Sequence, residues 1–309
     1  MQSSNQLAKA ERRIAIVSLM VGIVLLGIKF LAYFLTGSAA ILSDALESIV
    51  NVLAGAFALY AIILAHQPAD EEHPYGHGKV EFMSAGFEGG MIILAAVLIA
   101  ARAVEKLIHG VTLDQIESGL LLIALAMLIN GVVGFILIHK GKKNNSLTLE
   151  ADGKHLLSDS ITNVIVLCAL SIVHVTGWTW VDPLAALVVA IYIAWVAVGL
   201  LRRSAAGLMD EQDREDDALL RSILDSHLAP AGKPPLICSY HKLRHRHSGR
   251  YQWVDFHIMV PAALDIDHAH KMASAIEYEI ELAIGQGNAT AHIEPCVDPK
   301  CAACHPKPA

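Results

Sequence analysis

The sequence predicts an α-helical membrane protein with six transmembrane helices, followed by a small α+β domain. Of the 309 residues, 54% are hydrophobic and only 17% are charged, whereas soluble domains average roughly 45–50% apolar and about 25% charged residues. The long apolar runs fall almost entirely between residues 14 and 201, while residues 209–309 alternate short apolar stretches with charges. We therefore expect a transmembrane domain over 1–208, a second domain over 209–295 and a tail over 296–309.

Six segments are long and apolar enough to cross a bilayer, which takes about 20 mostly apolar residues. The connections between them alternate in charge: basic residues gather before the first segment and after the second, fourth and sixth, whereas the remaining connections are short and nearly uncharged. By the positive-inside rule, both termini and the α+β domain are expected in the cytoplasm. The six segments are residues 14–35, 39–65, 82–108, 117–139, 148–175 and 182–201.

Overall composition excludes two classes of protein. The formal net charge is -7 and no basic stripe is present, so nucleic acid is not an expected partner. The five cysteines are odd in number and scattered, with three crowded near the C-terminus, which is not the pattern of a disulfide framework.

The second and fifth segments carry polar residues where a membrane helix should be apolar. His155 and Asp159 are four residues apart, so a helix places the imidazole and the carboxylate on one face. In the second segment Asp44, Ser48 and Asn51 follow one face in the same way. Because ionisable groups inside a bilayer are costly and mark ion or proton sites, we expect these two helices to face each other. The alternative is that these side chains only hold helices together.

The loop after the second segment is a further candidate site. Asp70, His73 and His77 supply a carboxylate and two imidazoles within eight residues, a set that suits a divalent transition metal. The alternative is a solvated polar loop in which Pro74 and Gly76 simply make the turn.

The C-terminal domain is predicted to fold in the order helix, strand, strand, helix, strand. This order is typical of an open-faced α+β sandwich with two helices on one face of the sheet. Ser248-Gly249 makes the hairpin turn between the first two strands. The predicted helices are residues 213–227 and 265–284, and the predicted strands are residues 236–247, 251–260 and 289–294.

Histidines from several elements of this domain form a third candidate metal site. Converging His and Glu side chains indicate metal binding, although His245 and His247, which alternate with arginines, allow the alternative that the domain is merely histidine-rich. The candidates are His241 and His257 on adjacent strands, His270 on the second helix, and His292 and Glu294 on one face of the last strand.

The tail offers a competing interpretation. Cys301-Ala-Ala-Cys304-His305 matches the pattern for covalently attached c-type haem, which would make the chain a membrane-anchored redox protein. Such haem is attached outside the cytoplasm, whereas the charge bias places this tail inside, and no surrounding domain buries a porphyrin. A thiolate and imidazole metal site from Cys296, Cys301, Cys304 and His305 is favoured over haem, with a disordered tail as the other alternative.

Four motifs spread along the chain occur together in one known family. They are His73-Pro-Tyr-Gly-His-Gly-Lys-Val-Glu81, Lys154-His-Leu-Leu-Ser-Asp159, His241-Lys-Leu-Arg-His-Arg-His-Ser-Gly249 and Ala291-His-Ile-Glu-Pro-Cys296. The first resembles the loop signature of the cation diffusion facilitator family, the second its fifth-helix motif and the last two its cytoplasmic domain. The chain thus resembles this family, and within it the bacterial iron- and zinc-efflux branch, over nearly its whole length.

The resemblance implies a homodimer of six-helix subunits in the bacterial inner membrane, each with a ferredoxin-like, metallochaperone-like cytoplasmic domain. It implies a secondary transporter, not an enzyme, that exports a divalent metal ion such as Zn²⁺ or Fe²⁺ in exchange for protons and needs no other cofactor. Its partners would be a second copy of the chain, metal ions, protons and lipid. A membrane metal sensor that does not transport would carry the same sites and is the alternative.

Family roles carry over residue by residue. The resemblance assigns Asp44, His155 and Asp159 to the transport site, Asp70, His73 and His77 to the loop site, and His241, His257, His270, His292 and Glu294 to the cytoplasmic metal site, where Glu294 stands in a usual aspartate position.

One departure from the family concerns the second helix. Close relatives supply two aspartates four residues apart, but here the partner of Asp44 is Ser48, whose neutral hydroxyl is a poor zinc ligand. Glu47, Asn51 or a water molecule is left to complete the site, and the identity of the metal stays open.

Overall fold

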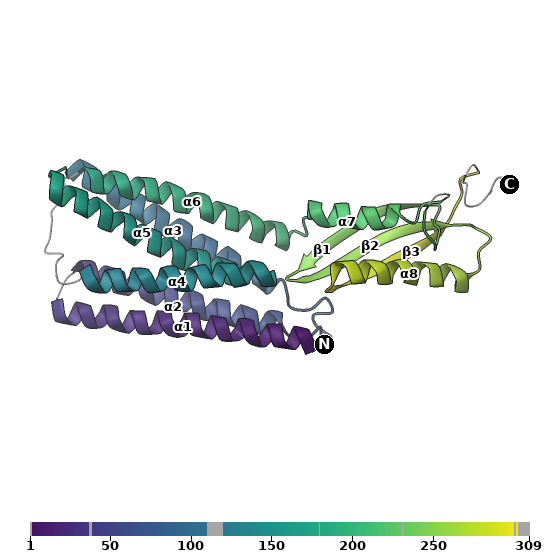
Figure 1. Cartoon of the computed structure of the whole chain (residues 1–309), viewed down its shortest axis with the longest axis horizontal. Helices are drawn as coiled ribbons and strands as arrows, with labels where there is room; N and C mark the ends of the chain where they lie inside the picture. The colour runs from purple at the N-terminus through teal and green to yellow at the C-terminus, as the bar shows by residue number, and fades with distance from the viewer. Residues whose placement is uncertain are drawn as a thin grey trace. The chain divides into compact units, whose positions relative to one another are not determined.

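The computed structural model covers the chain and describes residues 2–36, 39–109, 120–178, 180–229, 232–299 and 301 (Figure 1). The chain divides into two compact units, Met1–Ala206 and Gly207–Ala309.

The first unit is a bundle of long helices that lie lengthwise beside one another (Figure 1). Within the described residues, four helices contain a stretch long and apolar enough to cross a membrane. In the second helix, the apolar stretch found among the described residues is Asn51–Ala65. The bundle helices are α1 (Gln2–Thr36), α2 (Ala39–Ala65), α3 (Val80–His109), α4 (Leu120–Asn144), α5 (Leu147–Thr176) and α6 (Val181–Leu208).

Helices α4 and α5 approach each other backbone to backbone. A methyl group added at Gly153 would lie 2.7 Å from the Ile138 backbone nitrogen, and one added at Gly134 would lie 2.8 Å from the Gly153 carbonyl oxygen. Real Cβ atoms do not come this close, so only glycine permits this packing at both positions. The contact fixes the N-terminal half of α5, which carries His155 two residues after Gly153.

Buried acidic residues of the bundle are held by hydrogen bonds from neighbouring helices. The Ser18 hydroxyl donates to Asp152 at 3.0 Å, and the Ser146 hydroxyl donates to Glu81 at 2.9 Å. Glu150 pairs with both Lys154, at 2.8 Å, and Arg203, at 2.7 Å. Buried carboxylates need such partners. These contacts tie α1 and α6 to α5, and α3 to the turn that precedes α5.

The second unit is a three-stranded sheet with two helices. The sheet order is β1-β2-β3, with β1 antiparallel and β3 parallel to β2. Aspartate caps begin both helices: Asp213 accepts from the Glu215 and Asp216 amides, and Asp265 accepts from the His268 amide. The elements are α7 (Arg214–Asp225), β1 (Ser239–Ser248), β2 (Tyr251–Val260), α8 (Ile266–Ile284) and β3 (Gly287–Pro295).

Alternation along β2 separates the two faces of this sheet. Phe256 and Ile258 are buried in a core that also contains Leu220 of α7 and Ile276 of α8, whereas residues between them, such as His257, lie on the opposite face. Both helices therefore cover one face of the sheet. The predicted small α+β domain and its order of elements are confirmed; the first strand begins at Ser239, later than expected.

Candidate metal sites

The bundle brings three of the sequence-predicted residues together on α2 and α5. The Asn51 amide nitrogen donates to an Asp159 carboxylate oxygen at 3.0 Å, and the Asn51 carbonyl oxygen lies 3.0 Å from Nε2 of His155. The same His155 nitrogen is 3.8 Å from Asp159. All three side chains line one cavity of about 120 Å³, so an oxygen, a nitrogen and a carboxylate converge on a space large enough for an ion.

His155 also faces an acidic residue that sequence reasoning missed. Its Nδ1 lies 3.8 Å from Oε2 of Glu88 on α3. Glu88 is only 1% exposed, and neither of its carboxylate oxygens has a hydrogen-bond partner among the described residues. The sequence itself indicates Glu88, because it is an ionisable residue in an apolar run, and the same feature singled out His155.

A second missed residue is Lys29 on α1. Its ammonium group donates to the Ser48 hydroxyl at 2.7 Å, and Lys29 lines the same cavity as His155 and Asp159. Ser48, expected as a tentative ligand, therefore contacts a cation. A positive charge at this place opposes binding of a metal ion near Ser48 and balances nearby carboxylates.

The side chains of Asp44 and Glu47 lie outside the described residues, although both positions fall on α2. Residues four apart on a helix share a face, so Glu47 is the acidic position one turn before Asn51. Asp44 is seven residues from Asn51, which is about 10 Å along the helix axis at 1.5 Å per residue. The backbone geometry thus favours Glu47 and Asn51 over Asp44 and Ser48 as the pair beside His155.

The loop between α2 and α3 holds its three predicted residues close together. The ligand atoms of Asp70, His73 and His77 lie within 4.8 Å of one another, with His73 and His77 at 3.2 and 3.4 Å from the two Asp70 oxygens. The His73 backbone N–H donates to Asp70 at 2.6 Å, and this hydrogen bond lowers the pKa of Asp70. Asp70 is therefore an anion at neutral pH and is available to a metal ion.

The open face of the sheet in the second unit carries a row of three histidines. His241, His257 and His292 are direct neighbours across β1, β2 and β3. Glu294 accepts from Nδ1 of His257 at 2.8 Å, and the hydrogen bond from His257 lowers the pKa of Glu294. Glu294 lies 3.4 Å from His241 and 3.8 Å from His292, so four of the five predicted residues share one site.

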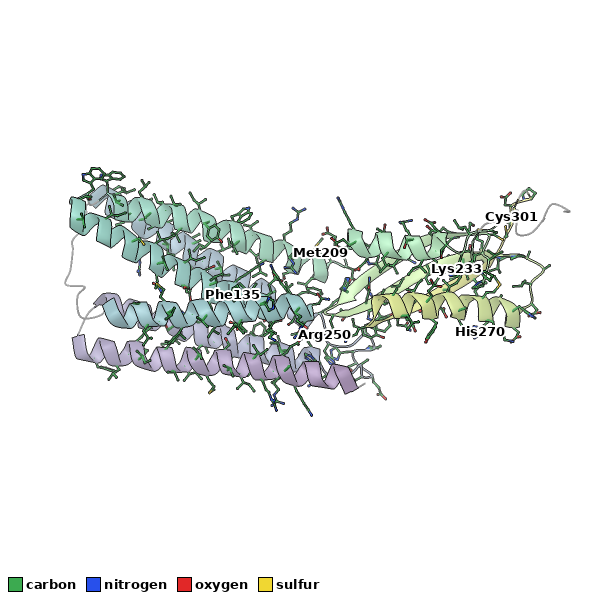
Figure 2. The ribbon with its side chains drawn as sticks, viewed as in Figure 1. Phe135, Met209, Lys233, Arg250, His270 and Cys301 are labelled. Carbon is green, nitrogen blue, oxygen red and sulfur yellow. The ribbon has the colours of Figure 1, made fainter. Side chains whose placement is uncertain are left out.

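His270 does not join this group within one chain. It is exposed on α8, and Figure 2 labels it on that helix. The buried face of α8, which includes Ala269 and Ala273, packs on the covered side of the sheet. The sheet itself therefore separates His270 from His257.

Cysteines form a further cluster, with a member that the tail motif did not include. The sulfur atoms of Cys238, Cys296 and Cys301 lie within 4.8 Å of one another. Cys304 and His305, the other predicted members, lie outside the described residues.

Comparison with known proteins covers both units. Residues 15–209 match the description "Cation efflux transmembrane domain", and residues 233–296 match "Cation efflux protein, cytoplasmic domain". The uncharacterized transporter sll1263 of Synechocystis sp. is 39% identical over 95% of this chain and 93% of its own length. The cation-efflux pump FieF of Shewanella oneidensis is 29% identical, with 90% of this chain and 92% of the pump aligned.

The FieF pump of Salmonella arizonae is 28% identical, with 92% of each chain aligned. These matches extend through the helix bundle and the cytoplasmic sheet, which are the two parts that hold the clusters described above. The chain therefore belongs to the cation efflux family and is a membrane transporter that exports metal cations, not an enzyme.

Proposed function

We propose that this chain exports a divalent transition-metal ion, Zn²⁺ or Fe²⁺, across the bacterial inner membrane in exchange for protons. The observation that carries the proposal is the contact of Asn51 with both His155 and Asp159 beside a cavity in the bundle. Polar and ionisable side chains inside a bilayer carry a high free-energy cost, and a binding site for a transported ion accounts for their presence.

The proposed transport site consists of Glu47 and Asn51 on α2 with His155 and Asp159 on α5. Two carboxylates and a neutral imidazole balance the charge of a divalent ion, and the Asn51 carbonyl adds a neutral oxygen ligand. Asp44 remains a candidate for a position one turn further along α2, where the ion would pass on entry or exit.

Protons and metal compete for this site. In the absence of metal, the carboxylates and the imidazole take up protons, and metal binding releases them. Alternating exposure of one site to the two sides of the membrane then couples metal export to proton entry. In this proposal all six bundle helices cross the membrane and both termini are cytoplasmic.

The loop site and the open-face site are proposed to bind metal on the cytoplasmic side. At the open face, His241, His257, His292 and Glu294 come from one subunit, and His270 can reach such a site only from a second copy of the chain. Metal shared in this way supports a homodimer that forms through the cytoplasmic domains.

A flux assay in proteoliposomes tests the transport proposal. An imposed pH gradient should drive uptake of Zn²⁺ or Fe²⁺ by the wild-type protein, and Asp159→Ala should abolish it because the site loses a carboxylate. Asp267→Asn is the matched control, since Asp267 is an exposed carboxylate on α8 that pairs with its neighbour Lys271. Undiminished flux in Asp159→Ala would exclude this site, and metal binding without flux in the wild type would identify a sensor.

A further inference from the structure

We propose that Cys238, Cys296 and Cys301 form a thiolate site for a zinc-type metal ion at one end of the cytoplasmic sheet. Their three sulfur atoms lie within 4.8 Å of one another. The inference is independent of the transport proposal, because none of these residues belongs to the bundle, the loop site or the open-face histidine row.

Strand pairing fixes two of the three cysteines. Cys238 directly precedes β1, and its backbone N–H donates to the Met259 carbonyl at 2.8 Å; Cys296 directly follows β3, and its N–H donates to the Val260 carbonyl at 2.8 Å. Both acceptors are the last residues of β2. Because β1 runs antiparallel and β3 parallel to β2, the start of β1 and the end of β3 meet at the same place.

A turn after β3 brings the third cysteine, Cys301, back to the end of the sheet where Cys238 and Cys296 lie. The Cys301 N–H donates to the Asp298 carbonyl at 3.2 Å, which folds the chain after β3 back toward the sheet. Figure 2 labels Cys301 where the chain leaves this end of the sheet. All three cysteines are partly buried and none forms a disulfide, so the sulfur atoms are sheltered and still accessible to an ion.

The spacing of the sulfurs suits a metal ion. Zn–S bonds of about 2.3 Å in a tetrahedron place sulfurs about 3.8 Å apart, so the three thiols need to close by about 1 Å or less. A disulfide would use two of the sulfurs and leave the third, and it would be reduced in the cytoplasm. Three thiolates select zinc and similar soft ions, with the fourth position taken by water or another ligand.

Cobalt(II) titration of the full-length reduced protein tests the proposal directly. Thiolate ligands give Co²⁺ an intense near-ultraviolet charge-transfer absorption, whereas sites built from His, Asp and Glu do not. The wild-type protein and the control Cys168→Ser, which removes an exposed thiol on α5, should show this band, and Zn²⁺ should displace it. Cys238→Ser and Cys301→Ser should each weaken Co²⁺ binding at least about tenfold, since even outer partners of metal ligands cost 10- to 100-fold.

Alkylation followed by mass spectrometry provides a readout on the unaltered protein. Zn²⁺ should protect Cys238, Cys296 and Cys301 together from alkylation. The proposal is overturned if the band is absent from the wild type, if Cys238→Ser leaves it unchanged, or if two of the thiols are found as a disulfide under reducing conditions. None of these measurements depends on metal flux, so the thiolate site and the transport site are tested separately.

Discussion

Asn51 puts an amide where a metal transporter would be expected to use a carboxylate. Its carbonyl oxygen faces His155 and its amide nitrogen donates to Asp159, so the side chain must turn its nitrogen away before Asp159 can bind an ion through that oxygen. The amide therefore keeps the metal-free site ordered and adds no charge. Affinity for the ion is expected to be moderate, as a transporter that must release its cargo requires.

Replacing Asn51 with Asp should strengthen metal binding in the bundle. A second acidic oxygen next to Asp159 raises the attraction for a divalent ion, and one elementary charge at contact distance is worth several kcal/mol at an effective dielectric constant of about 20. We expect the half-saturating concentration for Zn²⁺ flux to fall by about tenfold or more and release to become slower. Isothermal titration and flux measurements check this, with Asn288→Asp on the cytoplasmic sheet as the control; unchanged affinity would place Asn51 outside the site.

At the residue scale, the sequence singled out His155 and Asp159 on α5 but left their partners on α2 open beyond Asp44. His155 and Asp159 lie four residues apart just before the long apolar run of α5, so they share one face of that helix. On α2 the polar residues Asp44, Glu47, Ser48 and Asn51 cover more than one face, and periodicity alone does not say which face meets α5. Only the contact of Asn51 with α5 and that of Ser48 with Lys29 separate the two faces.

At the scale of elements, a carboxylate on α8 holds the segment between α7 and β1. Glu279 accepts from Lys233 and, at 3.1 Å, from Nε2 of the buried His227. The hydrogen bond from Lys233 and then that from His227 lower the pKa of Glu279 below its ordinary value of 4.5. A carboxylate whose folded pKa is lowered stabilises the fold above its unfolded pKa, and this stability is lost as the pH falls through the folded pKa.

Glu279→Gln should therefore destabilise the cytoplasmic unit at pH 7 and make it less sensitive to acid below about pH 4.5. The expected loss in free energy of unfolding is about 1 kcal/mol, since the side chain is 35% exposed and solvent screens the pair. Thermal unfolding at pH 7 and pH 4 measures the effect. Asp267→Asn, which breaks an exposed pair with Lys271, should change little; equal effects of the two variants would contradict the assignment.

The order of helices and strands in the cytoplasmic unit could be predicted from the sequence. Which distant side chains the fold brings together could not. Alternating burial and turn residues located each strand to within a few positions. Cys238 is far from the tail in sequence and carries no local motif, so only the pairing of β1 and β3 with β2 brings it to Cys296. For the same reason, no local pattern reveals that the sheet lies between His270 and His257.

At the scale of the whole molecule, the proposed open-face site would link metal binding to the assembly of two copies of the chain. If His270 completes this site from a second copy, metal should strengthen the cytoplasmic contact between subunits. His270→Ala should then lose the increase in dimer cross-linking that Zn²⁺ produces in the wild type, and His268→Ala, two positions away and exposed, should keep it. Light scattering and cross-linking measure this, and equal behaviour of the two variants would contradict a shared site.

The glycine contact between α4 and α5 has a consequence for how the bundle moves. Because Gly134 and Gly153 let the two backbones touch, sliding one helix past the other would drive neighbouring side chains into a backbone. The two helices are thus held together as one rigid pair, and α5 of this pair carries His155 and Asp159. In the proposed transport cycle, α4 and α5 would move together against α2, which carries Asn51, and the ion would be held between the two parts as the site opens to either side of the membrane.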